Sequence, residues 1–143
     1  MPLTSAGCYI DTSSLIRLLT PQHPSRQPLL DYLDQGSLWD QLCTSKLTHL
    51  ETTRVAIRDG NKALAKDVGS FLNEITVMPI TDDVLERAME IPFHIKSLDA
   101  IHVASAAAAS VILTSDKNMT SVLHQLQQDP NSSARYPFRA VVG

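Results

Sequence analysis

Hydrophobic positions along this chain follow two alternating patterns. Short apolar runs bounded by polar or turn residues predict buried strands, and apolar residues spaced three or four apart predict amphipathic helices. Strands are predicted at 7–10, within 38–44, at 75–80, in the apolar run before Asp116 and at 136–142. Helices are predicted to begin near Thr12, Ser25, Ser45, Asn61, Thr81, Ser97 and Asp116.

The helix signals specify which side chains should face inward. Ser45 is expected to cap its helix, and Gly60 is expected to end it. For this helix the predicted inward positions are Leu47, Leu50 and Val55. For the helix after Thr81 they are Leu85, Ala88 and Met89. Strands that alternate with helices predict a three-layer α/β/α domain with a mainly parallel central sheet of about five strands. A chain of 143 residues with 43% hydrophobic residues is expected to form one such domain over 1–143.

Composition narrows the class of protein only a little. The net charge of -3 does not indicate a nucleic-acid-binding surface, but it is compatible with a local basic patch. Cys8 and Cys43 lie in short apolar runs and are interpreted as reduced core residues. The chain shows neither a secretory signal pattern nor an apolar run long enough to span a membrane, so we expect a soluble, cytoplasmic protein.

Four carboxylates provide the candidate chemistry. Asp11 and Asp116 follow predicted strands, Asp99 lies in the first turn of a helix, and Glu51 lies beside an inward helical stripe. Ligands bind beyond the carboxyl ends of parallel strands, so these groups are predicted to converge at that edge of the sheet. Four converging acids repel one another unless a cation intervenes, and Mg²⁺ prefers oxygen ligands. The pattern predicts a divalent-cation site suited to phosphate chemistry.

Each carboxylate also has a structural interpretation. Asp11 and Asp116 are suitable helix caps, and Asp99 is a favourable charge at a helix amino end. Glu51 has Arg54 and Arg58 as possible partners on its own helix. Only the joint placement of the four favours a functional site over these local roles.

Other polar and aromatic residues carry weaker signals. His102, one turn after Asp99, is interpreted as a core residue or a support for the site rather than a ligand or base. Tyr9 and Trp39 are interpreted as packing residues. Contacts to RNA phosphates and a solvated charged surface are equally open for Arg17, Lys46, Arg54, Arg58, Lys96 and Lys117. The sequence contains no zinc-type Cys/His spacing and no glycine-rich phosphate loop.

Four segments together resemble the PIN-domain ribonucleases, particularly the toxins of VapBC toxin–antitoxin pairs. They are Tyr-Ile-Asp-Thr-Ser-Ser-Leu-Ile-Arg-Leu-Leu at 9–19, Thr-Ser-Lys-Leu-Thr-His-Leu-Glu-Thr-Thr-Arg at 44–54, Ser-Leu-Asp-Ala-Ile-His-Val-Ala-Ser-Ala at 97–106 and Leu-Thr-Ser-Asp-Lys-Asn-Met at 113–119. Their order and spacing agree with that family over almost the whole chain.

The resemblance implies a PIN-like fold and an endoribonuclease that requires Mg²⁺ or Mn²⁺. It implies that Asp11, Asp99 and Asp116 hold the metal, and that Glu51 holds a metal-bound water or orients the nucleophile. It also implies a supporting role for Thr114, an RNA substrate, a small antitoxin partner and a homodimer.

Two other functions fit parts of the same pattern. A catalytically silent PIN-like module would bind RNA or a protein without cleaving RNA. A phosphotransfer domain would accept a phosphoryl group on Asp11, but the second acid usually found two residues further on is absent, since Ser13 occupies that position.

Overall fold

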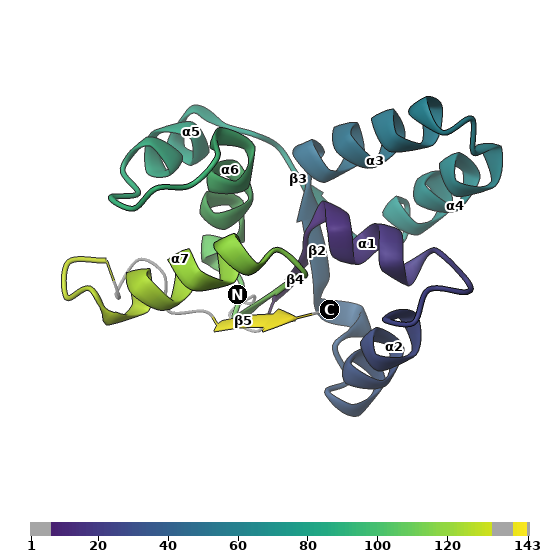
Figure 1. Ribbon diagram of the computed structural model, residues 1–143, viewed down its shortest axis with the longest axis horizontal. Coiled ribbons are helices and arrows are strands. Elements are labelled where there is room, and N and C mark those ends of the chain that lie inside the picture. Colours follow the sequence, from purple (N-terminus) through teal and green to yellow (C-terminus); the bar gives the residue numbers. More distant parts are fainter. Residues whose placement is uncertain (1–6, 133–138, 143) are drawn as a thin grey trace.

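A parallel β-sheet runs through the centre of the molecule with its strands in the order β3-β2-β1-β4-β5 (Figure 1). The strands are β1 (Cys8–Ile10), β2 (Leu42–Ser45), β3 (Thr76–Met78), β4 (Val111–Thr114) and β5 (Arg139–Val142). This computed structural model describes residues 7–132 and 139–142. The last strand is described over Arg139–Val142, and the first three residues of its predicted span, 136–142, lie outside the described residues.

The helices occupy the segments between the strands. They are α1 (Thr12–Leu18), α2 (Arg26–Gln35), α3 (Lys46–Arg58), α4 (Lys62–Leu72), α5 (Asp82–Met89), α6 (Ser97–Ser105) and α7 (Lys117–Gln128). Two 3₁₀ turns, η1 (Trp39–Gln41) and η2 (Ala106–Ala108), precede β2 and β4. Gly60 follows the end of α3 with a φ of 61°, the left-handed conformation that favours glycine after a helix.

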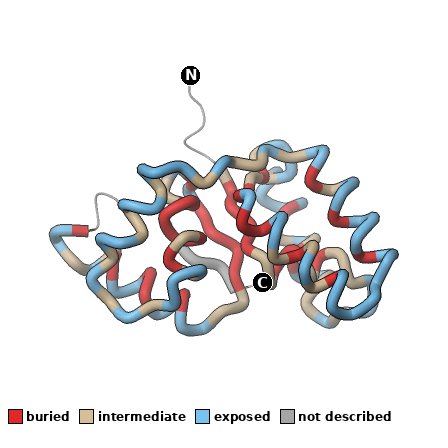
Figure 2. Tube along the Cα trace, turned by 90° about the horizontal axis from the view of Figure 1, so that it is seen from above, coloured by how far each residue is buried: buried red, intermediate tan, exposed pale blue. Residues whose placement is uncertain are grey.

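The two faces of the sheet are covered by different helices. Cys8 and Ile10 point to one face and Tyr9 to the other, because successive side chains of a strand alternate. The first face packs against α1 to α4, and the second packs against α6 and α7 (Figure 1). Strands β1 and β4 at the centre of the sheet are buried throughout (Figure 2). The predicted α/β class, with a parallel sheet covered on both faces, is confirmed.

The strand order explains where a site can form. The chain leaves β1, builds β2 and β3 on one side of it, and then places β4 on the other side. Ile10 pairs with Leu113, so the carboxyl ends of β1 and β4 lie next to each other. This is the point where the strand order reverses, and open α/β sheets bind ligands there.

Some predicted inward positions are exposed instead. Leu50 is 58% exposed, because the buried side of α3 consists largely of Thr48, Thr52 and Ala56. A hydrophobic pattern does not identify this buried stripe, because two of its residues are threonines. Thr52 can be buried because its hydroxyl donates to the Thr48 carbonyl at 2.7 Å.

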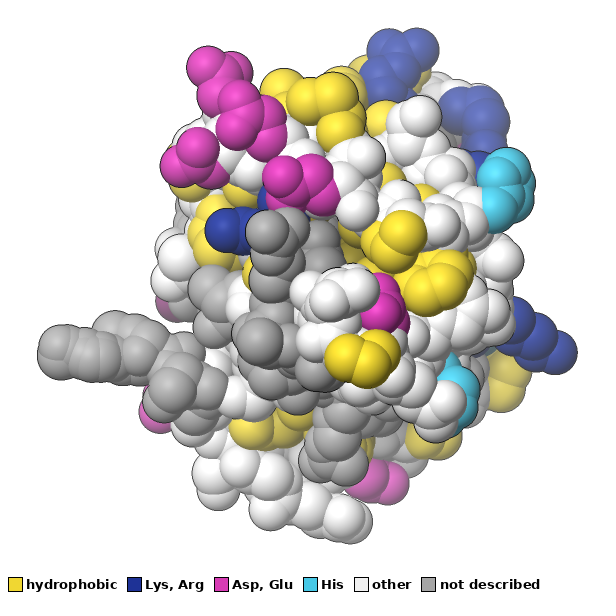
Figure 3. Space-filling view, turned by 90° about the vertical axis from the view of Figure 1, so that its left-hand side faces the viewer, with side chains coloured by type: hydrophobic (Ala, Val, Ile, Leu, Met, Phe, Trp, Pro, Cys, Tyr) yellow, Lys and Arg dark blue, Asp and Glu magenta, His cyan; other side chains and the backbone are white. Residues whose placement is uncertain are grey.

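Helix α5 also departs from its prediction. Met89 is 76% exposed and Leu85 is 38% exposed. Helix α5 packs against α6, and both side chains line an open surface cavity of about 390 Å³ between the two helices. Acidic side chains gather beside hydrophobic ones on this face of the molecule (Figure 3). Within the described residues, no helix has the length and apolar character needed to cross a membrane.

Candidate active site

Asp11 extends β1 by one residue and begins α1. Its backbone N–H donates to the Leu113 carbonyl at 3.1 Å, which ties it to the end of β4. Its Oδ1 accepts hydrogen bonds from the Ser14 N–H and the Ser13 hydroxyl, both at 3.0 Å. Oδ2 has no hydrogen-bond partner among the described residues. Asp11 is therefore a helix cap with one carboxylate oxygen left over.

Asp116 repeats this arrangement at the end of β4. Its Oδ1 accepts from the Met119 N–H at 3.0 Å and caps α7. Its own N–H donates to the Thr114 hydroxyl at 3.0 Å. Thr114 is fully buried and does not line the cavity, so it supports the backbone of Asp116 from behind. Ser115 lines the cavity instead, and its hydroxyl lies 2.8 Å from that of Ser13.

Glu51 reaches the same region from α3. Its Oε1 accepts hydrogen bonds from the Thr12 hydroxyl at 2.6 Å and from His102 Nε2 at 2.7 Å. Burial raises the pKa of this carboxyl, but the hydrogen bonds from His102 and Thr12 outweigh burial and hold the pKa below its ordinary value. Glu51 is thus kept ionised by neutral or positive donors, and neither Arg54 nor Arg58 pairs with it.

Asp99 lies in the first turn of α6 and has the opposite surroundings. No hydrogen bond to its carboxylate forms within residues 7–132. Partial burial raises its pKa, and the nearby charges of Asp116 and Glu51 raise it further. A positive ligand beside Asp99 would therefore favour its ionised form.

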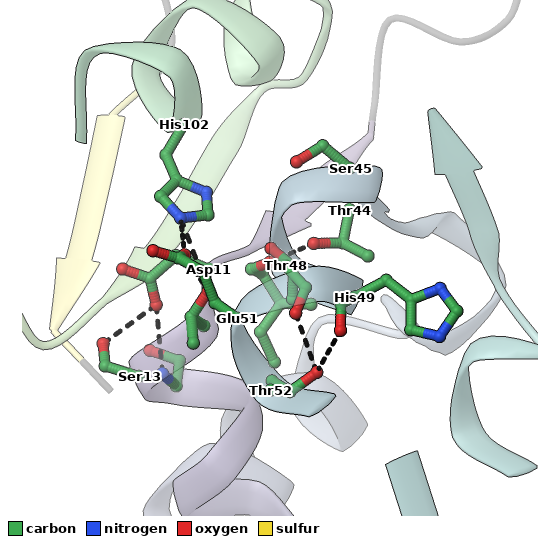
Figure 4. Close-up of polar contacts among 12 residues, drawn as sticks. Asp11, Ser13, Thr44, Ser45, Thr48, His49, Glu51, Thr52 and His102 are labelled. Atoms are coloured by element: carbon green, nitrogen blue, oxygen red, sulfur yellow. Dashed lines mark hydrogen bonds and ion pairs between the residues drawn. The ribbon is translucent and has the colours of Figure 1, made fainter. Parts of the chain in front are cut away.

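A cavity of about 330 Å³ brings the four acids together. It is lined by Asp11, Thr12, Ser13, Ile16, Glu51, Asp99, His102, Ser115 and Asp116. Figure 4 shows His102 reaching from α6 toward Glu51, with Asp11 beside them. In the described part of the chain, none of the four carboxylates forms an ion pair with a lysine or arginine.

The donor chemistry of the cavity fits a hard divalent cation. Apart from His102, its polar lining consists of carboxylate and hydroxyl oxygens, which Mg²⁺ and Mn²⁺ prefer. Asp11, Asp99 and Asp116 each retain at least one carboxylate oxygen without a hydrogen bond in the described structure. Among the described residues, no three acidic, histidine or cysteine side chains are already drawn together around a single point.

Comparison with known proteins identifies the family. The sequence profile of the PIN domain matches residues 8–123, which is most of the chain. The chain belongs to the PIN-domain family. Ribonuclease VapC47 of Mycobacterium tuberculosis is 34% identical to it over 108 residues, which cover 74% of this chain and 79% of that protein.

Solved structures share the PIN fold at lower identity. VapC20 of M. tuberculosis, described as a Sarcin-Ricin loop cleaving toxin, has 17% identity and a TM-score of 0.65, covering 80% of this chain and 94% of that one. VapBC2 of Rickettsia felis, bound to a DNA fragment from its promoter, has 12% identity and a TM-score of 0.64, covering 95% and 98%. At these identities the likeness establishes the fold alone.

The PIN domain of this chain contains one feature that the sequence interpretation underestimated. Tyr9 is fully buried, as a packing residue should be, but its hydroxyl lies 2.8 Å from both Ser45 Oγ and His102 Nδ1. Ser45 occupies the N-cap position of α3 and makes no side-chain cap, so its predicted capping role is wrong. His102 is 2% exposed and supports Glu51, in agreement with its interpretation as a supporting residue.

Proposed function

We propose that this PIN domain is a divalent-metal-dependent endoribonuclease that hydrolyses phosphodiester bonds in RNA. The observation that carries the proposal is the convergence of Asp11, Glu51, Asp99 and Asp116 in one cavity, without a lysine or arginine partner among the described side chains. The cavity lies where the strand order reverses, as expected for a catalytic site in a parallel sheet. The similarity to a protein named as a VapC ribonuclease supports the same reaction.

The residues that line the cavity would have different roles in the reaction. Asp11 and Asp116 would hold Mg²⁺ or Mn²⁺ through the carboxylate oxygens that their capping hydrogen bonds leave over, and Asp99 would hold it through a carboxylate without hydrogen bonds in the described structure. A bound divalent ion lowers the pKa of a water molecule and balances charge on the phosphate. Glu51 stays ionised and has Oε2 available to accept a hydrogen bond from the attacking water. Ser13 and Ser115 supply hydroxyls at the same edge of the cavity.

Replacing Asp99 by asparagine tests the reaction. Asp99→Asn keeps the size of the side chain but removes the charge that a cation would neutralise. Changes in groups that only orient metal ligands cost about 10–100-fold, so loss of a ligand should slow RNA cleavage by at least about 100-fold. The measurement is the cleavage rate of a labelled single-stranded RNA and of an RNA stem-loop, with and without Mg²⁺ or Mn²⁺.

A matched variant separates this effect from general loss of charge. Asp83 is an exposed acid on α5 outside the cavity, and Asp83→Asn should cleave at the wild-type rate. Preparations made side by side exclude a contaminating nuclease. Full activity in Asp99→Asn would overturn the proposal, and RNA binding without cleavage under every divalent ion would favour a silent PIN-like module.

We further propose that this nuclease is the toxin of a type II toxin–antitoxin pair and forms a homodimer. Solved structures that share its fold include VapBC complexes and a toxin–antitoxin complex from Klebsiella pneumoniae, the latter with 20% identity, a TM-score of 0.64 and coverage of 80% and 91%. A small antitoxin that masks the acidic cavity would block access of RNA. Co-expression with the product of an adjacent short reading frame should yield a stable complex without RNA cleavage. Absence of such a complex, or a complex that still cleaves RNA, would contradict the toxin assignment.

A further inference from the structure

A chain of buried hydrogen bonds leads from the core of the molecule to Glu51. Ser45 Oγ lies 2.8 Å from the Tyr9 hydroxyl, which lies 2.8 Å from His102 Nδ1. His102 Nε2 then lies 2.7 Å from Glu51 Oε1. Ser45 and Tyr9 are fully buried and His102 is nearly so. The four groups come from β2, β1, α6 and α3, so they meet only in the folded protein.

The chain draws Ser45 away from its local role. A serine at a helix N-cap normally accepts a hydrogen bond from a backbone N–H of the first turn. The Ser45 side chain makes no such bond and contacts Tyr9 instead. A buried tyrosine hydroxyl without partners is costly, and here it has two. The fold therefore satisfies this hydroxyl at the expense of a helix cap.

When His102 is a neutral imidazole, the chemistry of the two ends fixes the direction of the hydrogen bonds. An ionised carboxylate only accepts, so His102 Nε2 carries a proton and donates to Glu51. In a neutral imidazole Nδ1 is then an acceptor, and the Tyr9 O–H donates to it. Tyr9 keeps its proton at neutral pH, since burial raises its pKa to about 12. Ser45 in turn donates to the Tyr9 oxygen.

The result is a carboxylate held by one oxygen only. Glu51 Oε1 receives both His102 and Thr12, whereas Oε2 has no hydrogen bond within the described structure. Without these two donors, the Glu51 carboxylate would be free to rotate about the terminal bonds of its side chain. Holding Oε1 therefore keeps Oε2 available to the cavity that Glu51 lines.

We propose that Tyr9 and His102 are positioning residues that orient Glu51 for the reaction, with Ser45 as the outer end of the chain. The proposal rests on the proposed nuclease function, because it assigns these residues a role at the same cavity. Tyr9 does not line the cavity, and His102 acts through its contact with Glu51. Their effect is to fix which oxygen of Glu51 is held and which is free.

The decisive variant is Tyr9→Phe, which keeps the buried ring and removes only the hydroxyl. We expect kcat for RNA cleavage to fall about 10–100-fold with KM nearly unchanged, as for loss of an outer partner of a site residue. The control is Tyr32→Phe on α2, which borders a different cavity and should retain wild-type kcat. Circular dichroism of both variants establishes that the fold is intact.

Replacements of His102 test the direction of the chain independently of Tyr9. The amide nitrogen of glutamine reaches the position of Nε2 and can still donate to Glu51, whereas that of asparagine reaches only the position of Nδ1. His102→Gln should therefore retain at least about tenfold more activity than His102→Asn. Equal activity of the two variants would overturn the assignment of Nε2 as the donor.

A readout that does not depend on cleavage separates this inference from the proposed function. In ¹⁵N-labelled protein, a proton on His102 Nε2 held by Glu51 should give a downfield resonance that exchanges slowly with water. This resonance should weaken or vanish in Tyr9→Phe and stay unchanged in Tyr32→Phe. Failure of the wild-type protein to cleave RNA would overturn the nuclease function but leave this test valid. Wild-type kcat together with an unchanged His102 resonance in Tyr9→Phe would overturn the positioning role.

Discussion

Glu51 and Asp99 line the same cavity, but their carboxyl groups lie in opposite electrostatic surroundings. Burial of Glu51 is more than offset by hydrogen bonds from His102 and Thr12, so its pKa is lowered. Burial of Asp99, with no hydrogen bond in the described structure and with Asp116 and Glu51 nearby, raises its pKa. Pairs of acids with divergent pKa values are typical of catalytic sites.

The two shifts act on stability with opposite signs. A lowered pKa means that ionised Glu51 stabilises the fold above the ordinary carboxyl pKa, and this contribution is lost as pH falls through the lowered value. A raised pKa means that Asp99 binds more protons in the folded state, so stability decreases as pH rises from its ordinary value through the raised one. Ionisation of Asp99 therefore lowers the stability of the metal-free fold.

At the scale of secondary structure, α1 and α7 begin in the same way. Each helix follows an inner strand and uses Oδ1 of an aspartate as its cap, which leaves Oδ2 without a hydrogen bond in the described structure. Capping and metal binding are therefore compatible roles for Asp11 and Asp116. The helix start also fixes the carboxylate in place, which suits a group that must hold a ligand.

Two substitutions of Asp116 separate these roles. Asparagine caps a helix as well as aspartate does, so Asp116→Asn should keep the free energy of unfolding within about 0.5 kcal/mol of wild type. Asp116→Ala loses the bond to the Met119 N–H and should lose about 1 kcal/mol. Both should lose RNA cleavage, because both lack the charge. The measurements are urea unfolding in a chelator and the cleavage rate.

A cap outside the cavity provides the control. The Thr81 hydroxyl accepts from the Val84 N–H at 3.2 Å and caps α5. Thr81→Ala should cost a similar free energy of unfolding and leave cleavage unchanged. If Asp116→Asn cleaved RNA at the wild-type rate, Asp116 would be a cap and nothing more.

The same elements show what local sequence signals can predict. Strand ends and helix starts are local, so the positions of Asp11, Asp99 and Asp116 follow from short segments. The role of Tyr9 depends on His102, 93 residues further along the chain, and no periodicity connects the two. The exposed Leu50 and the buried Thr48 were missed because hydrophobicity alone defined the inward face of α3.

At the scale of the whole molecule, the order of the strands creates the site. The alternation of strands and helices predicts the layers, but it does not specify which strands are neighbours. The pairing of β1 with β4 brings residues 11 and 116 to one edge, and α3 and α6 then add Glu51 and Asp99. Burial and the charges of Asp116 and Glu51 disfavour the ionised form of Asp99, and a bound cation would offset this effect.

Thermal unfolding should therefore test for a cation site, because the difference in melting temperature between wild type and Asp99→Asn should change sign when metal is added. Without metal, Asp99→Asn should unfold at a higher temperature than wild type, because asparagine does not carry the charge that the cavity disfavours. With Mg²⁺ or Mn²⁺ at 100 times its Kd, wild type should gain about 2.7 kcal/mol. In a domain of this size, each kcal/mol of added stability raises Tm by roughly 3 °C. Asp99→Asn should gain little, so the order of the two melting temperatures should reverse. Melting curves in a chelator and in each ion, at matched ionic strength and with Asp83→Asn as the control, measure this directly. A parallel rise in all three proteins would mean that the ion acts elsewhere on the surface.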